Sequence, residues 1–246
     1  MIFRQIRGVI TEVPVIKSMR FFSSSGPRPK NVFIVIMGPP GSGKGTISER
    51  IVRDFKLLYL SSGDVLRNHI SNQTEFGVQI KPIVAAGKLV PSSLLTPMIE
   101  ADISKLKSTG DTGFLLDGFP RSVDQAESLQ RTHPPNLAIQ LDVPFETIIN
   151  RIKSRYIHLP SGRVYNLDYN PPKVTGKDDV TGEALTQRED DKPESVKKRL
   201  EIYQSVMDPI LEYYKNKQVL QVFSGTESNV IYPQVKRFLE DFLKKQ

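Results

Sequence analysis

Short apolar runs alternate with helical patterns along most of the chain. Residues 32–37 are six consecutive apolar residues that lead directly into Gly38. Such a run is typical of a strand that is buried on both faces. Similar runs occupy residues 57–60, 114–116, 137–141 and 219–223. The alternation predicts an α/β fold with a doubly wound, five-stranded parallel sheet, helices on both faces and right-handed crossovers.

Four stretches between these runs place their apolar residues on one helical face, which predicts helices that pack against the sheet. The four sets are Ile47, Ile51 and Phe55; Leu94, Leu95, Met98 and Ile99; Phe145, Ile148, Ile149 and Ile152; and Val196, Leu200, Tyr203 and Met207.

Two segments depart from this alternation. Residues 61–90 are helical in pattern but polar and without a strand, and residues 154–191 contain several glycines and prolines without apolar periodicity. A loop as long as the second segment is usually functional in a compact domain. We therefore expect a core of residues 31–60, 91–153 and 192–246 with two insertions, the second a candidate lid.

The N-terminal segment, residues 1–30, differs in composition from the rest. It holds six of the 34 basic residues and one of the 27 acidic residues, and its apolar residues recur at helical intervals. These features are typical of a mitochondrial transit peptide, here expected to be cleaved near Phe22, with a disordered basic tail as the alternative. The expected location is the mitochondrial matrix.

Composition excludes several other classes of protein. The net charge of +7 comes mostly from residues 1–30, so we do not expect a nucleic-acid-binding domain. No apolar stretch is long enough for a membrane span, so membrane insertion is not expected either. The absence of cysteine excludes disulfides, thiolate catalysis and any sulfur-ligated zinc or iron cluster, and three histidines make a histidine-rich metal site unexpected.

The strongest motif is the sequence GPPGSGK at residues 38–44, directly after the first predicted strand and before a helix. This is the context that a phosphate-binding Walker A loop requires. Its glycines let successive backbone N–H groups point into one concavity, and Lys44 adds a positive charge for the β and γ phosphates. Gly45 follows Lys44, so the hydroxyl that usually contacts Mg²⁺ is displaced by one position, to Thr46.

Asp117 follows the strand predicted at residues 114–116. A carboxylate at this position holds the water shell of the metal in many phosphate-loop enzymes. The alternative is that Asp117 only begins a turn with Gly118, but the phosphate-binding loop favours the functional interpretation.

A regulatory GTPase is disfavoured. Its D-x-x-G motif occurs here only at residues 179–182, inside the second insertion, and residues 216–219 lack the aspartate of an N-K-x-D motif.

The arginines favour phosphoryl transfer between two nucleotides. Such a site must hold several mutually repelling phosphates, which requires forked, permanently charged donors rather than a general base. Any one of these arginines taken alone is better explained by a solvated surface ion pair. Six arginines lie near the insertions or the strand ends: Arg67, Arg121, Arg151, Arg155, Arg188 and Arg199.

Five ordered motifs give the chain after residue 30 a resemblance to the adenylate kinases that have a long lid. They are residues 38–46, 60–64 (LSSGD), 87–90 (GKLV), 117–121 (DGFPR) and 161–166 (SGRVYN). In this family a Lys-Gly-Thr ending of the phosphate loop is normal. Residues 187–194 and 223–229 are most similar to the mitochondrial branch of the family, the GTP:AMP phosphotransferases.

The resemblance implies a nucleoside monophosphate kinase domain over residues 31–246, with an NMP-binding insertion at 61–90 and a lid insertion at 154–191. The implied reaction is reversible, Mg²⁺-dependent phosphoryl transfer from GTP (or ITP) to AMP, which gives GDP and ADP. ATP as the donor is one alternative, and a nucleotide-binding sensor without turnover is another. A monomer is expected.

The resemblance also assigns roles to residues. The implied AMP site consists of Ser62, Arg67, Lys88, Leu89, Val90, Gly118, Phe119, Pro120, Arg121, Gln125, Arg188 and Arg199. The implied donor site consists of Gly41, Ser42, Gly43, Lys44, Gly45, Thr46, Arg151, Arg155, Val164, Tyr165 and Ser228. The implied catalytic residues are Lys44, Arg121, Arg155, Arg188 and Arg199.

Further roles follow from the same resemblance. Mg²⁺ would be held through the nucleotide, waters, Thr46 and Asp117, and Gln125 suits the adenine edge, where it can both donate and accept. Asp190 and Asp191 are expected to orient lid arginines.

Some adenylate kinases bind zinc in the lid through four cysteines. The corresponding residues here are His158, Ser161, Asp178 and Thr181. This set is a poor zinc site because two neutral hydroxyls replace thiolates. We expect a hydrogen-bonded cluster there and no structural zinc.

Overall fold

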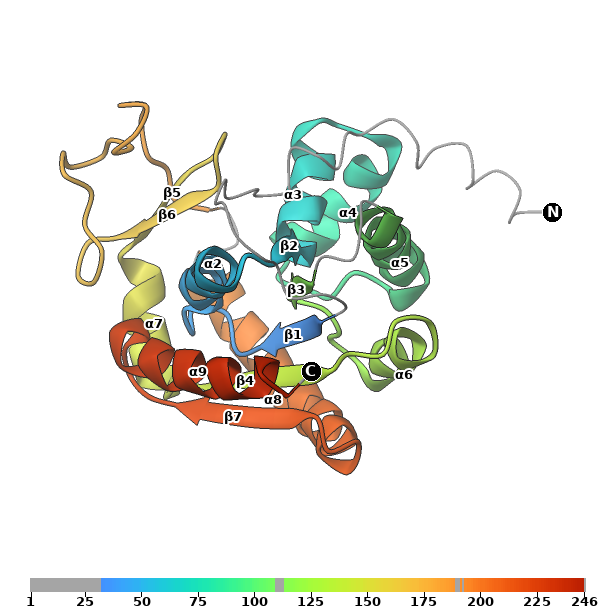
Figure 1. Cartoon of the computed structure of the whole chain (residues 1–246). Helices are drawn as coiled ribbons and strands as arrows, with labels where there is room; N and C mark the ends of the chain where they lie inside the picture. The colour runs from blue at the N-terminus through green and yellow to red at the C-terminus, as the bar shows by residue number, and fades with distance from the viewer. Residues whose placement is uncertain (1–31, 109–112, 189–190, 192, 246) are drawn as a thin grey trace.

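The computed structural model describes residues 32–108, 113–188, 191 and 193–245. The expected transit peptide, its cleavage site and Asp190 lie outside the described residues. The central sheet has five parallel strands in the order β2-β3-β1-β4-β7, which confirms the predicted fold class (Figure 1). The strands are β1 (Phe33–Met37), β2 (Leu58–Ser61), β3 (Phe114–Asp117), β4 (Leu137–Asp142) and β7 (Leu220–Ser224).

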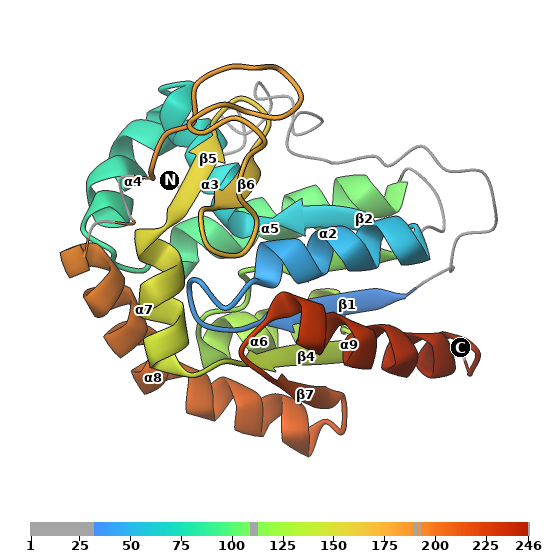
Figure 2. The same ribbon diagram turned by 90° about the vertical axis from the view of Figure 1, so that its left-hand side faces the viewer.

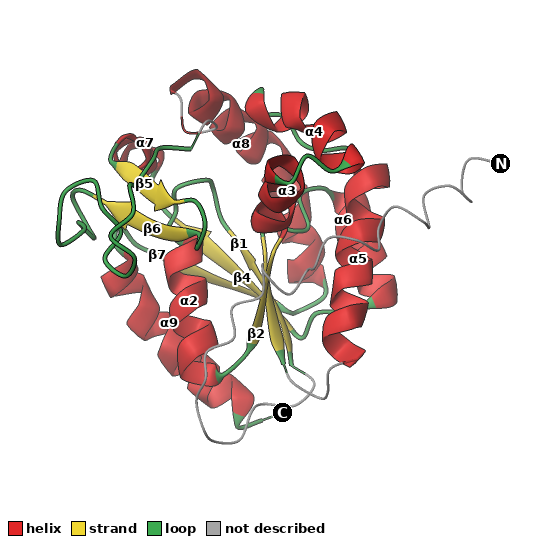
Figure 3. Ribbon diagram, turned by 90° about the horizontal axis from the view of Figure 1, so that it is seen from above, coloured by secondary structure: helices red, strands yellow, loops and turns green. Residues whose placement is uncertain are grey.

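Helices cover both faces of this sheet (Figure 3). One face packs against α2 (Lys44–Phe55), α7 (Phe145–Lys153) and α9 (Ser228–Leu243). The other packs against α5 (Ser92–Ser108), α6 (Val123–Thr132) and the second half of α8 (Pro193–Asn216). No described helix combines the length and the apolar character that a membrane crossing would need.

The apolar run in β1 shows why the sheet is doubly covered. Phe33, Val35 and Met37 belong to the hydrophobic cluster on one face, and Ile34 and Ile36 belong to the cluster on the other. Because successive side chains of a strand point to opposite faces, a strand inside such a sheet must be apolar at every position.

The buried face of α7 is narrower than the apolar face predicted for residues 145–152. In α7, Ile148 and Ile152 are buried, but Ile149 is 42% exposed. Adjacent residues of a helix point about 100° apart. Ile149 is therefore turned out of the face that packs against the core.

The first insertion forms α3 (Ser62–Ser71) and α4 (Glu75–Ala85), and the second forms a hairpin of β5 (Arg155–His158) and β6 (Arg163–Asn166). Sequence periodicity did not predict this hairpin. Bridges between Ile157 and Thr186 and between Lys177 and Ala184 connect the rest of the second insertion. Both insertions project from the same side of the sheet in Figures 1 and 2.

Candidate nucleotide-binding site

The phosphate-binding loop connects β1 to α2, and the helix begins at Lys44. The residue before it, Gly43, has a φ of 91°, a backbone conformation that only glycine adopts readily. A Cβ there would lie 2.6 Å from Oγ of Ser228, at the start of α9. The glycine thus permits the loop conformation and also brings Ser228, a predicted donor-site residue, against the loop.

Lys44 lies across this loop. Its Nζ donates hydrogen bonds to the carbonyl oxygens of Gly38 at 2.6 Å and Pro39 at 2.9 Å. These two contacts hold the ammonium group over the concavity formed by the loop.

Charges of both signs surround Lys44 and affect its pKa. Burial lowers this pKa from 10.5 to about 8, and the negative charge of Asp117 opposes the shift. Three guanidinium groups lower it further, those of Arg121, Arg199 and Arg155. The structure therefore brings Lys44 into one electrostatic environment with three of the predicted catalytic arginines.

Asp117 is the last residue of β3, and it is buried. Burial raises the pKa of its carboxyl, and both Lys44 and a hydrogen bond from Tyr59 oppose that shift. The Tyr59 hydroxyl donates to Oδ2 at 2.9 Å. A carboxylate at this edge of the sheet is a hard oxygen ligand of the kind that Mg²⁺ and its waters prefer, so the site fits the ion that the resemblance implies.

Thr46 lies elsewhere on α2. It is exposed, and it is two residues, about 200° of helical rotation, from Lys44. A role for its hydroxyl toward Mg²⁺ stays a prediction.

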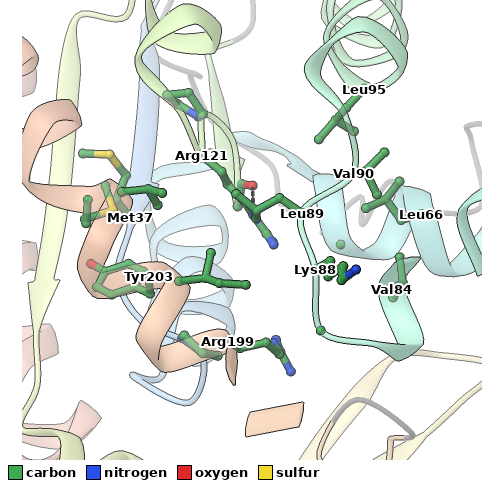
Figure 4. Close-up of a pocket in the computed structure, with 18 of the residues that line it drawn as sticks. Met37, Leu66, Val84, Lys88, Leu89, Val90, Leu95, Arg121, Arg199 and Tyr203 are labelled. Carbon is green, nitrogen blue, oxygen red and sulfur yellow. Dashed lines mark hydrogen bonds between the residues drawn. The ribbon is translucent and has the colours of Figure 1, made fainter. Parts of the chain in front are cut away.

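A pocket next to the loop gathers five basic residues together with apolar side chains. The basic residues are Lys44, Arg67, Lys88, Arg121 and Arg199. In Figure 4, Arg121 and Arg199 come from the β3–α6 turn and from α8, and Leu66, Val84 and Val90 lie on the other side. A pocket that combines cationic and apolar side chains suits a nucleotide, whose phosphate and base have these two characters.

The turn after β3 holds Arg121 in place. Gly118 has a φ of 80°, and its carbonyl oxygen accepts hydrogen bonds from Ser62 Oγ and from Arg121 Nε, both at 2.7 Å. Gln125 accepts from the Arg121 backbone N–H at 2.7 Å and donates from Nε2 to Ser92 Oγ at 3.0 Å. Gln125 is thereby fixed in the pocket wall through both ends of its amide, and its contact with an adenine edge stays a prediction.

Most of the predicted AMP residues line this pocket. Nine do so: Arg67, Lys88, Leu89, Val90, Gly118, Pro120, Arg121, Gln125 and Arg199. Ser62 instead supports the Gly118 turn, and Phe119 is fully buried in the hydrophobic core. Arg188 is not among the lining residues. Contact of Phe119 or Arg188 with a nucleotide stays a prediction.

Arg151 connects the phosphate-binding loop to the β7–α9 connection and to the second insertion. It donates to the carbonyl oxygen of Ser42 at 3.1 Å and to that of Thr226, in the β7–α9 connection, at 2.5 Å. Its guanidinium also lies over the ring of Tyr169, 5.2 Å from the centroid. Neither Thr226, which contributes through its backbone, nor Tyr169 is predicted from the sequence.

The lid and the core meet at Asp191, whose side chain is 2% exposed. Arg155, at the start of β5, donates to both carboxylate oxygens, with Nε at 2.7 Å from Oδ2. Nη1 of Arg199 on α8 lies 3.7 Å from Oδ1. The predicted contact of Asp191 with arginines is therefore present, and it includes one arginine from the core.

Two lid residues that were assigned to the donor site differ in exposure. Val164 is 40% exposed, whereas Tyr165 is buried. The Tyr165 hydroxyl donates to Asp178 Oδ1 at 2.9 Å and accepts from the backbone N–H of Asp179 at 2.8 Å. The hydroxyl thus stabilises the lid itself, and donor contacts of both residues stay a prediction.

The four lid residues at the possible zinc positions form one hydrogen-bonded cluster. Nδ1 of His158 lies 2.7 Å from Ser161 Oγ, and Thr181 Oγ1 donates to Asp178 Oδ2 at 3.0 Å. Within the described ranges, no group of three or more His, Asp or Glu side chains is arranged to hold a metal ion.

Two further residues complete this cluster. Arg163 donates to both oxygens of Asp178, at 2.7 and 2.6 Å, and lowers the pKa of that carboxyl well below its usual range. Glu183 contacts Nε2 of His158. The lone pairs that zinc would need are already occupied, so the donor set does not fit zinc.

We accordingly expect protein purified without added zinc to contain far less than one zinc ion per chain. Elemental analysis by mass spectrometry checks this. Stoichiometric zinc that survives dialysis would contradict the expectation.

The phosphate-binding loop, the basic pocket and the two insertions define a nucleotide-binding protein of the nucleoside monophosphate kinase class. A sequence model described as "Adenylate kinase" matches residues 36–219. The chain therefore belongs to the adenylate kinase family.

Curated relatives are similar over most of their length. A Drosophila melanogaster protein named "GTP:AMP phosphotransferase, mitochondrial" is 48% identical over 207 residues, which cover 84% of this chain and 94% of that protein. A Saccharomyces cerevisiae protein of the same name is 44% identical over 213 residues, which cover 84% of this chain and 91% of its own length.

Proposed function

We propose that this chain is a GTP:AMP phosphotransferase, which transfers the γ-phosphoryl group of GTP to AMP and gives GDP and ADP in a reversible reaction. The observation that carries the proposal is the convergence of Lys44, Arg67, Arg121 and Arg199 on one pocket beside the phosphate-binding loop. A site for one nucleotide does not need so many cations at this position. The names of the relatives support GTP and AMP as substrates.

The chemistry requires alignment and charge stabilisation more than proton transfer. The acceptor is an ionised phosphate oxygen of AMP, so no general base is needed. Arg67 and Arg121 would bind the AMP phosphate, and Lys44 would bind the donor phosphates. Arg199 would stabilise the negative charge of the group in transfer.

Mg²⁺, when bound with the donor, would supply further neutralisation of the phosphate charges. Asp117 would hold its water shell. The lid would close over the donor and exclude water, because water would otherwise accept the phosphoryl group. Arg155 at the base of the lid would then approach the donor phosphates.

The proposed location is the mitochondrial matrix. The names of the relatives include the word "mitochondrial", and the composition of residues 1–30 supports an import sequence. The proposed partners are the two nucleotides alone, without nucleic acid, and the proposed state is a monomer.

Initial rates with GTP, ITP and ATP, each at saturating AMP and Mg²⁺, test the donor assignment. We expect kcat/KM for GTP and ITP to exceed that for ATP by about tenfold or more, the effect of roughly one recognition hydrogen bond. Equal or faster rates with ATP would support the alternative of an ATP-dependent adenylate kinase. Nucleotide binding without any ADP formed from AMP would support a sensor and contradict an enzyme.

A further inference from the structure

Tyr59 lies on the same face of the sheet as Asp117. In the parallel register, Tyr59 is opposite Leu115 and Ser61 is opposite Asp117. Side chains two residues apart on a strand share a face, so Tyr59 is the diagonal neighbour of Asp117, within reach of a long side chain. The Tyr59 ring belongs to the hydrophobic cluster that lies under α2, the helix that begins with Lys44.

Both polar groups of this pair are buried. Tyr59 is 8% exposed and Asp117 is 7% exposed. A phenol in an apolar cluster needs an acceptor, and a buried carboxylate needs donors, so the bond of 2.9 Å between them satisfies both requirements. Burial and two nearby carboxylates, Asp117 and Asp64, raise the pKa of Tyr59 well above 10, so its hydroxyl remains a donor.

This bond fixes the orientation of the carboxylate. Among the described residues, Tyr59 alone donates a hydrogen bond to the Asp117 side chain, and the bond goes to Oδ2. Oδ1 is therefore left for groups that arrive with the substrate. Without the hydroxyl, the main partner left for the Asp117 carboxylate would be the ammonium group of Lys44. This group is the positive charge that stabilises the carboxylate most.

We propose that Tyr59 is a positioning residue for phosphoryl transfer: its hydroxyl holds Asp117 so that Oδ1 faces the water shell of Mg²⁺, and it prevents Asp117 from drawing Lys44 away from the donor phosphates. This inference rests on the proposed function. Tyr59 is not among the residues that line the pocket, so its effect passes through Asp117.

Tyr59→Phe tests the proposal, because it removes one oxygen and keeps the ring. The Kd of GTP is measured by calorimetry with and without Mg²⁺, and kcat and the KM for AMP are measured separately. The ratio of the Kd of GTP without Mg²⁺ to that with Mg²⁺ should be about three- to tenfold smaller in the variant than in the wild type. The kcat of the variant should be about tenfold lower. The KM for AMP should stay within about twofold, because the AMP pocket is unchanged.

Tyr232→Phe is the matched control. The Tyr232 hydroxyl donates to Asp54 Oδ2 at 2.7 Å, so the control also loses a tyrosine–aspartate bond, but at the α2–α9 contact near the far end of α2. A loss of thermal stability that both variants share measures the structural cost of losing such a bond. The control should keep the effect of Mg²⁺ on GTP binding and keep kcat.

Several results would overturn the inference. One is a Tyr59→Phe protein that matches the control in both Mg²⁺ dependence and kcat. Another is a wild-type chain whose affinity for GTP does not respond to Mg²⁺. If Tyr59→Phe does not fold, Tyr59→Met is used in its place, because methionine fills the space with a flexible apolar side chain. The expected changes in Mg²⁺ dependence and in kcat are the same.

The calorimetric readout separates this inference from the proposed function. A wild-type chain that forms no ADP contradicts the function, while the effect of Mg²⁺ on binding still decides the role of Tyr59. A wild-type chain that forms ADP, with Tyr59→Phe behaving like the control, contradicts only the role of Tyr59.

Discussion

Lys44→Ala is expected to lower kcat for phosphoryl transfer from GTP to AMP by about 10³-fold, within the range known for single groups that stabilise a transition state. Lys44 is the cation that the loop itself carries, and its Nζ already lies over the concavity where the donor phosphates would bind. Alanine has no positive charge with which to stabilise the phosphoryl group as it moves from the donor to AMP. ADP formation in a coupled assay measures the effect.

The fold should survive this substitution. Burial lowers the pKa of Lys44 to about 8, so the folded chain holds this proton less tightly than the unfolded chain does. The lysine charge is thus a cost to folding, and its removal should leave the thermal midpoint unchanged or raise it. Lys215→Ala, in the exposed last turn of α8, is the control for the loss of one charge. Turnover of Lys44→Ala near that of the control would contradict the assigned role.

Arg121→Ala is expected to lower kcat/KM for AMP by roughly 10²–10³-fold. The guanidinium of Arg121 lines the pocket, and the bond from Nε to the Gly118 carbonyl orients its two remaining nitrogens as a fork. A phosphate takes two parallel hydrogen bonds from such a fork. Initial rates at varied AMP and saturating GTP measure the loss.

Arg121→Lys should recover little of this activity, because a lysine offers a point charge and no fork. Arg131→Ala on the exposed side of the neighbouring α6 is the control, and it should behave like the wild type. Activity of Arg121→Ala within a few fold of this control would show that the AMP phosphate is bound elsewhere.

The core of the fold was predictable because its elements are defined by local apolar patterns. Each strand of the sheet is buried on at least one face, and β1 is buried at every residue, so each appears as a short apolar run. The phosphate-binding loop was predictable for a similar reason, since its glycines and lysine act within one continuous segment. The order of the strands depends on crossovers between distant segments, and the sequence pattern did not indicate it.

The hairpin of the second insertion could not be predicted from apolar patterns. The hairpin is held by polar contacts, such as the ion pair of Arg163 with Asp178, and it has few buried apolar residues. A pattern search for apolar periodicity finds nothing in such a segment. The possible zinc positions could be named only through the resemblance, and Glu183, which also contacts His158, was not found at all.

Within the site, sequence motifs identified positions but not the directions of side chains. Phe119 belongs to a motif that borders the pocket, yet its ring packs into the core. Tyr59 lies in a strand that appears purely apolar, and only the parallel register brings its hydroxyl to Asp117. Such diagonal contacts depend on pairing between segments that are far apart along the chain.

The shared contact at Asp191 has a consequence for how the site fills. One carboxylate balances two guanidinium groups, Arg155 from the lid and Arg199 from the core. An arriving phosphate that engages both arginines competes with this carboxylate and takes over as their counterion. Under the proposed function, substrate entry would be an exchange of one anion for another across the same pair of arginines, so that the lid and the core would share a counterion before and after it.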